Sequence, residues 1–162
     1  MLEMTPVRTA VVRCFGTPRA LDAFPPAGAA LARVAPDELW LLAPATSRND
    51  LAKRAKAYLA GADPDGTALD HTDGWVAWTL GGPKVLTAFS RLSAIDLPRE
   101  RPAFVQGAVA EIPAKALLQS DHLHLLVPAQ FAHHMARRIT QACADLEVKV
   151  REAREIVLEQ AS

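Results

Sequence analysis

The amino-acid sequence predicts an α+β protein in which short strands alternate with amphipathic helices. Apolar residues recur with period two in some short runs and with helical period in others, which indicates both element types. In addition, the stretch PDELWLLAP that begins at Pro36 resembles SDHLHLLVP, which begins 84 positions later at Ser120. A strand-to-helix unit that occurs twice would explain both observations.

The first elements are expected near the N-terminus. VRTAVVRCF (7–15) mixes β-branched with polar residues and predicts a strand. Thr17 followed by Pro18 is a typical helix start, so a short helix is expected to run to about Phe24, where two prolines end it. ELWLLAP (38–44) then predicts a strand whose Leu39 and Leu41 share one face.

A second helix is expected after Ser47, with Asp50 in the position of a weak capping box. Its apolar stripe is Leu51, Ala55, Tyr58 and Leu59, and Gly61 is a natural end. GWVAWTL (74–80) predicts the next strand, with Val76, Trp78 and Leu80 on one face. The following helix carries a stripe of Val85, Leu86, Phe89 and Leu92.

The C-terminal half repeats this alternation. Two strands are expected, FVQGAVAEI (104–112) and DHLHLLV (121–127), before a helix from about Ala129 to Cys143. LEVKV (146–150) alternates as a strand, and the Arg/Glu-rich tail from Arg151 predicts a terminal helix. The sequence thus gives two successive sets of strands and helices.

The match at offset 84 includes the strand, the connection and the helix. The identities or close matches pair Asp37, Leu39, Leu41, Leu42, Pro44, Ala45 and Ala52 with Asp121, Leu123, Leu125, Leu126, Pro128, Ala129 and Ala136. We interpret this as an internal pseudo-repeat of 36–60 and 120–144 within a single domain spanning 1–162. Convergence on a favourable strand-to-helix connection is the alternative.

Composition excludes several classes of function. Lys+Arg and Asp+Glu both number 18, and no basic run occurs, so nucleic acid and anionic membranes are not expected partners. No apolar stretch approaches the roughly 20 residues of a membrane span, and no signal peptide is visible. Cys14 and Cys143 show no metal-binding or redox spacing, which favours buried thiols in a cytoplasmic protein, with one disulfide as the alternative.

With these elements in place, the chain resembles the gamma subunit of heterotetrameric sarcosine oxidase. The resemblance covers about Val7 to Ala142, and its most specific parts are PDELWLLAP and LGGPKVLTAFSRLSAIDLP. That family is grouped with the folate-binding glycine-cleavage T-protein and its YgfZ-like relatives. The resemblance implies two ferredoxin-like β-α-β units that form a T-protein/YgfZ-like domain.

The resemblance also implies a function. In the four-chain oxidase the gamma chain binds no cofactor and serves assembly, while FAD, FMN, NAD and tetrahydrofolate belong to other subunits. We therefore expect a non-catalytic subunit of a flavin-dependent secondary-amine oxidase, with alpha- and beta-type flavoprotein partners. A stand-alone folate-binding or aminomethyltransferase-like protein and a homo-oligomer without oxidase role are the alternatives.

Few residues are candidates for chemistry. Asp96 occupies a place similar to that of a folate-contacting Asp in the T-protein, although it could equally accept hydrogen bonds from the turn before Pro98. Gly81-Gly82-Pro83-Lys84 could attract an anion, but its glycines also suit a tight turn. The sequence identifies no catalytic residue.

Four histidines, His122, His124, His133 and His134, lie close together in the sequence, yet a metal site is not expected because at most three of them could converge. Interface candidates lie on the strand faces away from the expected cores: Trp40, Leu42, Trp75 and His124. Apolar side chains on such a face would bind a partner chain, or form a homodimer when the chain is isolated.

Overall fold

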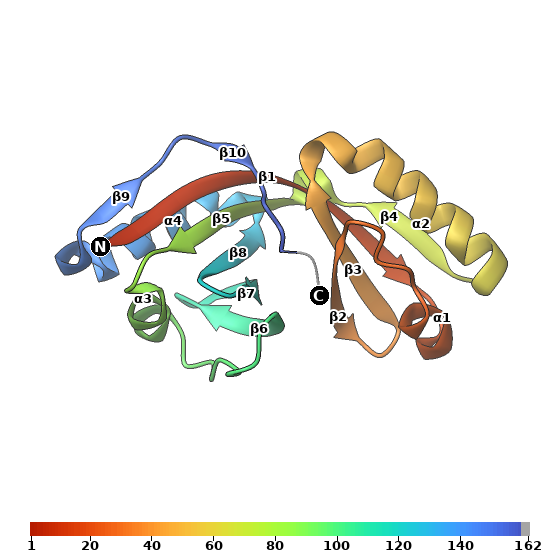
Figure 1. Cartoon of the computed structure of the whole chain (residues 1–162), viewed down its shortest axis with the longest axis horizontal. Coiled ribbons are helices and arrows are strands. Elements are labelled where there is room, and N and C mark those ends of the chain that lie inside the picture. The colour runs from red at the N-terminus through yellow and green to blue at the C-terminus, as the bar shows by residue number, and fades with distance from the viewer. Residues whose placement is uncertain (160–162) are drawn as a thin grey trace. The chain divides into compact units, whose positions relative to one another are not determined.

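The computed structural model describes residues 1–159 and divides the chain into two compact units. Unit 1 comprises Met1–Arg8 and Gly74–Arg154, and unit 2 comprises Thr9–Asp73 and the chain from Glu155. Both units combine antiparallel strands with helices, so the predicted α+β class is confirmed (Figure 1). None of the helices in residues 1–159 combines the length and the apolar composition that a membrane span requires.

Strand β1 (Leu2–Phe15) contributes to both units. Its first half pairs with β5 (Trp75–Gly81), and its second half pairs with β3 (Glu38–Pro44). The strand begins five residues earlier than the sequence indicates. Pro6 hides this extension, because proline is disfavoured inside strands.

Unit 2 has the element order strand, helix, strand, strand, helix, strand. Helix α1 (Pro18–Asp22) starts as predicted, since the Thr17 side chain accepts a hydrogen bond from the Ala20 N–H. The other elements, in chain order, are β2 (Ala30–Ala35), β3, α2 (Arg48–Ala62) and β4 (Thr67–Asp70). β1 lies between β3 and β4, and β2 pairs with the other edge of β3, all antiparallel.

The helices of unit 2 cover one face of its strands (Figure 1). Leu39 and Leu41 of β3 are buried in this core, as the alternation predicts. They pack with Leu51, Ala55 and Leu59 from α2. Strands β2 and β4 are not recognisable in the sequence, because their short stretches lie among turn residues without clear alternation.

Unit 1 adds β5, α3 (Val85–Leu92), β6 (Ala103–Val109), β7 (Ile112–Leu118), β8 (His122–Pro128), α4 (Ala132–Ala142) and β9 (Val148–Val150). The strands lie in the order β1-β5-β8-β7-β6, and β9 pairs parallel with the start of β1. Both helices pack on the face that carries Leu80, Leu123 and Leu125. Unit 1 therefore also has one helix-covered face.

The segment predicted as one strand over 104–112 is instead a hairpin. β6 and β7 pair through Val109 and Ile112, so Ala110 and Glu111 form a two-residue turn. Both turn residues have positive φ, 48° and 66°. Such turns usually contain Asn or Gly, and the sequence therefore gives no turn signal here.

Two further expectations are wrong. The stripe of α3 includes Ala88 rather than Leu86, which is 57% exposed. The tail from Arg151 forms no helix up to residue 159; it contains the short strand β10 (Arg154–Glu155), which pairs with β1. The last three residues of that tail lie outside the described residues.

The segments matched at offset 84 have the same local structure. β3 and β8 span corresponding residues, and each leads through one 3-10 turn, Ala45–Ser47 or Ala129–Phe131, into its helix. Pro44 and Pro128 have nearly the same backbone angles, with φ of −53° and −56° and ψ of 141° and 140°. Their strands also share one burial pattern along their length.

Candidate functional site

A cavity of unit 1 lies where α3 begins, next to the turn between β7 and β8. It has a volume of about 440 Å³. The start of α3 and the strand ends supply apolar side chains, while the turn and the loop after α3 supply polar ones. The polar lining consists of Arg101, Gln119, Ser120, Asp121 and His122.

Gly82 shapes this end of the unit. Its φ is +97°, and a Cβ placed there would lie 2.9 Å from the carbonyl oxygen of Met1. The Gly82 carbonyl accepts a hydrogen bond from the Val85 N–H, which begins α3. Gly82 thus serves the tight strand-to-helix turn that the sequence suggests.

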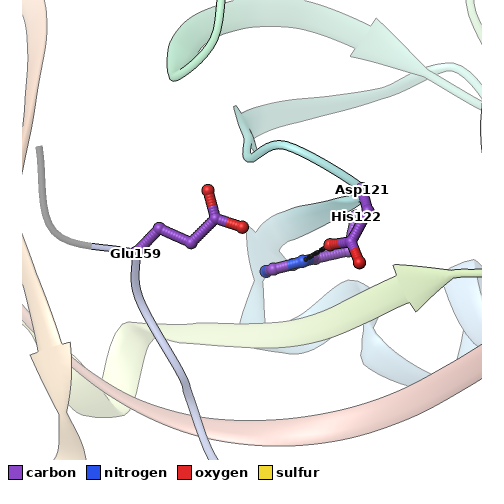
Figure 2. Close-up of side chains that lie close together, drawn as sticks. All are labelled: Asp121, His122 and Glu159. Atoms are coloured by element: carbon purple, nitrogen blue, oxygen red, sulfur yellow. Dashed lines mark hydrogen bonds and ion pairs between the residues drawn. The ribbon is translucent and has the colours of Figure 1, made fainter. Parts of the chain in front are cut away.

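Asp121 and His122, which both line the cavity, form a polar pair. Figure 2 shows their side chains in contact. The distance between His122 Nδ1 and Asp121 Oδ1 is 2.7 Å. This hydrogen bond lowers the pKa of Asp121, so the carboxylate is ionised at neutral pH. Glu159, also drawn in Figure 2, belongs to unit 2.

A row of buried polar side chains crosses three strands of unit 1 beside this pair. Thr5, Thr79 and His124 are neighbours on β1, β5 and β8, and each is less than 10% exposed. Thr79 Oγ1 and His124 Nδ1 are 2.9 Å apart. The rings of His122 and His124 lie 4.8 Å apart with an edge-to-face orientation.

The structure brings only two of the four candidate histidines together. His133 and His134 are exposed on α4, which packs on the side of Leu123 and Leu125. His122 and His124 alternate with those leucines and therefore point to the opposite face. A shared metal site for the two pairs is not compatible with this arrangement.

The corresponding positions of unit 2 hold a different polar cluster. Glu38 and Trp40 stand at offset 84 from His122 and His124. Glu38 Oε1 accepts hydrogen bonds from Arg13 Nε and Trp40 Nε1, both at 2.8 Å. The Arg13 guanidinium also lies 5.5 Å from the centre of the Trp40 ring. The two strands thus share their geometry, whereas the polar side chains at corresponding positions differ.

The four interface candidates differ in accessibility. Trp40, Leu42 and His124 are at most 2% exposed, so they present almost no surface to a partner. Trp75 is only partly buried, and the Lys115 ammonium lies 5.1 Å from the centre of its ring. Among the four, Trp75 alone retains accessible surface. The alternation of residues along a strand could not distinguish the accessible candidate from the buried ones. It shows which strand face a residue occupies, but not whether other residues cover that face.

Asp96 lies exposed on the loop after α3. Within residues 1–159 it makes no hydrogen bond, so it does not stabilise the turn before Pro98. Ser93 does this instead: its hydroxyl donates to the Ala108 carbonyl at 2.7 Å and accepts from the Ile95 N–H at 3.2 Å. The structure thus places a lone carboxylate at the predicted folate position.

Both cysteines are buried free thiols. Burial raises the pKa of Cys14 to about 12. Burial also raises the pKa of Cys143, although the nearby Arg91 opposes this effect. Neither thiol is activated as a nucleophile, because the thiolate is the reactive form.

Comparison with solved structures gives a clear fold match. A chain of heterotetrameric sarcosine oxidase from Corynebacterium sp. U-96, solved with pyrrole 2-carboxylate, superposes with a TM-score of 0.77 and 18% identity. The match covers 91% of this chain and 86% of that one. The two chains share one fold. No protein-family model and no curated protein matches the sequence.

Two other structures show related folds. The glycine cleavage system aminomethyltransferase T from Bartonella henselae matches with a TM-score of 0.60 and 16% identity. The match covers 92% of this chain but only 47% of that protein. The regulatory subunit of aspartate kinase from Thermus thermophilus matches with a TM-score of 0.55 and 12% identity. This match covers 87% of this chain and 95% of that one. The resemblance to the sarcosine oxidase and T-protein group is confirmed at the level of fold.

Proposed function

We propose that the chain is a gamma-type, non-catalytic subunit of a heteromeric flavin-dependent sarcosine or secondary-amine oxidase. The observation that carries this proposal is the fold match with a chain of heterotetrameric sarcosine oxidase, which includes 91% of this chain and 86% of that one. The match thus includes most of each of the two chains.

The side chains with catalytic potential support an assembly role. Burial raises the pKa values of both thiols. His124 is 1% exposed and shares a hydrogen bond with Thr79. In this proposal FAD, FMN, NAD and tetrahydrofolate bind to the partner chains, and this chain contributes contact surface. Trp75 is the best contact candidate, since partly exposed tryptophans are enriched in binding hot spots.

We also propose that both units are ferredoxin-like and arose by duplication. Unit 2 supports this proposal with its strand, helix, strand, strand, helix, strand order, which is that of the ferredoxin-like fold. The match at offset 84 adds a second argument, since β3 and β8 agree in length, burial and connection. Unit 1 departs from this plan by two extra strands, the first half of β1 and the hairpin strand β6.

The subunit proposal is tested by purifying the tagged chain from its native cell. We expect larger flavoprotein chains and flavin absorbance to co-purify with it. Trp75→Ala should reduce the recovered flavin, while Leu69→Ala, which truncates another exposed apolar residue, should not. Melting curves of both variants show whether they remain folded. Recovery of the chain alone, as a monomer or a homo-oligomer, would refute the subunit role.

Folate binding by the isolated chain would rest on Asp96. A single exposed carboxylate supplies too few oriented contacts for a pterin ring. We therefore propose that tetrahydrofolate binds weakly or not at all, as measured by calorimetric titration. Micromolar affinity that is lost in Asp96→Asn would instead favour an aminomethyl-transfer function.

A further inference from the structure

The cavity beside α3 has the size and lining of a small-molecule site. Its volume of about 440 Å³ is typical of ligand pockets. Val85, Leu86 and Leu118 form part of an apolar wall. Leu86 faces this cavity with 57% of its surface exposed, although the other large apolar residues of α3 are buried.

Arg101 supplies a positive charge at the rim. Its Nη1 donates hydrogen bonds to the carbonyl oxygens of Pro98 and Glu100. Within residues 1–159 no carboxylate pairs with this guanidinium, so its charge meets only neutral oxygens. The edge formed by Nε and Nη2 is not used by these carbonyls, and two such N–H groups match the two oxygens of a carboxylate.

The acidic group at the rim is differently placed. The Asp121 carboxylate already accepts a hydrogen bond from His122. The Asp121 carboxylate therefore has the His122 imidazole as a partner. The Arg101 guanidinium has no carboxylate partner within residues 1–159. This asymmetry favours an anionic ligand over a cationic one.

We propose that this cavity binds a small organic carboxylate with an apolar body. Leu86 and its apolar neighbours contact the body, and the Nε–Nη2 edge of Arg101 holds the carboxylate. This binding goes beyond the subunit role and does not depend on it, because every residue involved belongs to unit 1 of this chain.

The test is an NMR and calorimetric titration of the full chain with 4-phenylbutyrate. The neutral 4-phenylbutanol and the cationic 4-phenylbutylamine serve as matched probes. We expect the acid to shift the amide signals of Leu86, Leu118 and His122 and to bind more tightly than either analogue. Arg101→Gln should weaken binding of the acid about tenfold, the usual cost of a lost charged hydrogen bond.

Two control variants make the result specific. Arg99→Gln removes a neighbouring charge that does not line the cavity, and it should leave the affinity unchanged. Leu86→Ser should weaken binding, whereas Leu69→Ser, a half-exposed leucine of unit 2, should not. The proposal is overturned if millimolar acid shifts no cavity signal, if the alcohol or amine binds equally well, or if Arg101→Gln behaves like Arg99→Gln.

Discussion

Arg91 on α3 binds both carboxylate oxygens of Asp145, which follows α4. Nη1 lies 2.5 Å from Oδ1, and Nη2 lies 3.0 Å from Oδ2. The same Nη1 also donates to the carbonyl of Ala142, the last residue of α4, at 3.1 Å. One side chain therefore joins the two helices of unit 1 and satisfies an end carbonyl of the second.

We expect Asp145→Asn to make the fold less sensitive to acid. The hydrogen bond from Arg91 lowers the pKa of Asp145 below its usual value of 3.8. The ionised pair therefore stabilises the fold above that pH, and this contribution is lost as the pH falls through the lowered pKa. The free energy of urea unfolding at about pH 5 and about pH 2 should differ less in the variant.

The effect is small, because both side chains are substantially exposed. Asp96→Asn is the matched control, since Asp96 is exposed in the same unit and makes no hydrogen bond within residues 1–159. An equal change of acid sensitivity in both variants would show that the Arg91–Asp145 pair does not contribute.

The thiols should be inert in the folded protein. At about pH 8, Ellman's reagent should label neither cysteine within minutes, and both after denaturation, because only the thiolate reacts. Above its usual pKa of 9.0, Cys14 ionises in the unfolded chain while burial keeps it protonated in the fold. Stability should thus fall as the pH rises from 9 toward 12. Rapid labelling of one thiol in the native state would contradict this burial.

Truncation of equivalent core leucines should destabilise each unit. Leu41→Ala and Leu125→Ala each remove a side chain that is 0% exposed, and each should lower the free energy of unfolding by about 2–5 kcal/mol. Leu86→Ala is the control. Because the side chain of Leu86 is half-exposed, its truncation should lower the free energy of unfolding by less than about 1 kcal/mol in denaturant titrations. A cost for Leu86→Ala as large as that for Leu125→Ala would contradict the burial of α3 described above.

Gly82→Ala should destabilise unit 1. A Cβ at Gly82 would lie 2.9 Å from the Met1 carbonyl oxygen, at a φ of +97°. The variant should lose more than about 1 kcal/mol of unfolding free energy. Gly61→Ala, in α2 with nothing within 4 Å, should be neutral or stabilising. Thermal melts compare the two, and a Gly82→Ala protein as stable as the native one would rule out a steric role.

Elements with strong local signals are predictable from the sequence. Thr17-Pro18 marks the start of α1, and Leu39 and Leu41 alternate into the core of unit 2. By contrast, the Ala110-Glu111 turn has no residue that favours positive φ, and the charged tail pairs as strand β10 because tertiary contacts override its helical composition.

The candidate site was less predictable than the fold. His122 and Gly82 each attract attention in the sequence, but nothing there indicates that they line one cavity with Arg101. Leu86 stands three residues before Phe89, so helical periodicity assigns it to the core, although it lies at the edge of the stripe. Convergence of distant loops depends on strand register, which single-sequence patterns do not contain.

The division of β1 between both units affects how the chain is made. Met1–Arg8 leaves the ribosome before unit 2, yet its partner strand β5 follows only after the whole Thr9–Asp73 segment. At roughly 5–20 residues per second, the first strand waits about 3 to 13 s for that partner. Unit 2 can acquire most of its core within this interval. During synthesis, unit 1 is therefore the later unit to fold, although its segment Met1–Arg8 precedes unit 2 in the sequence.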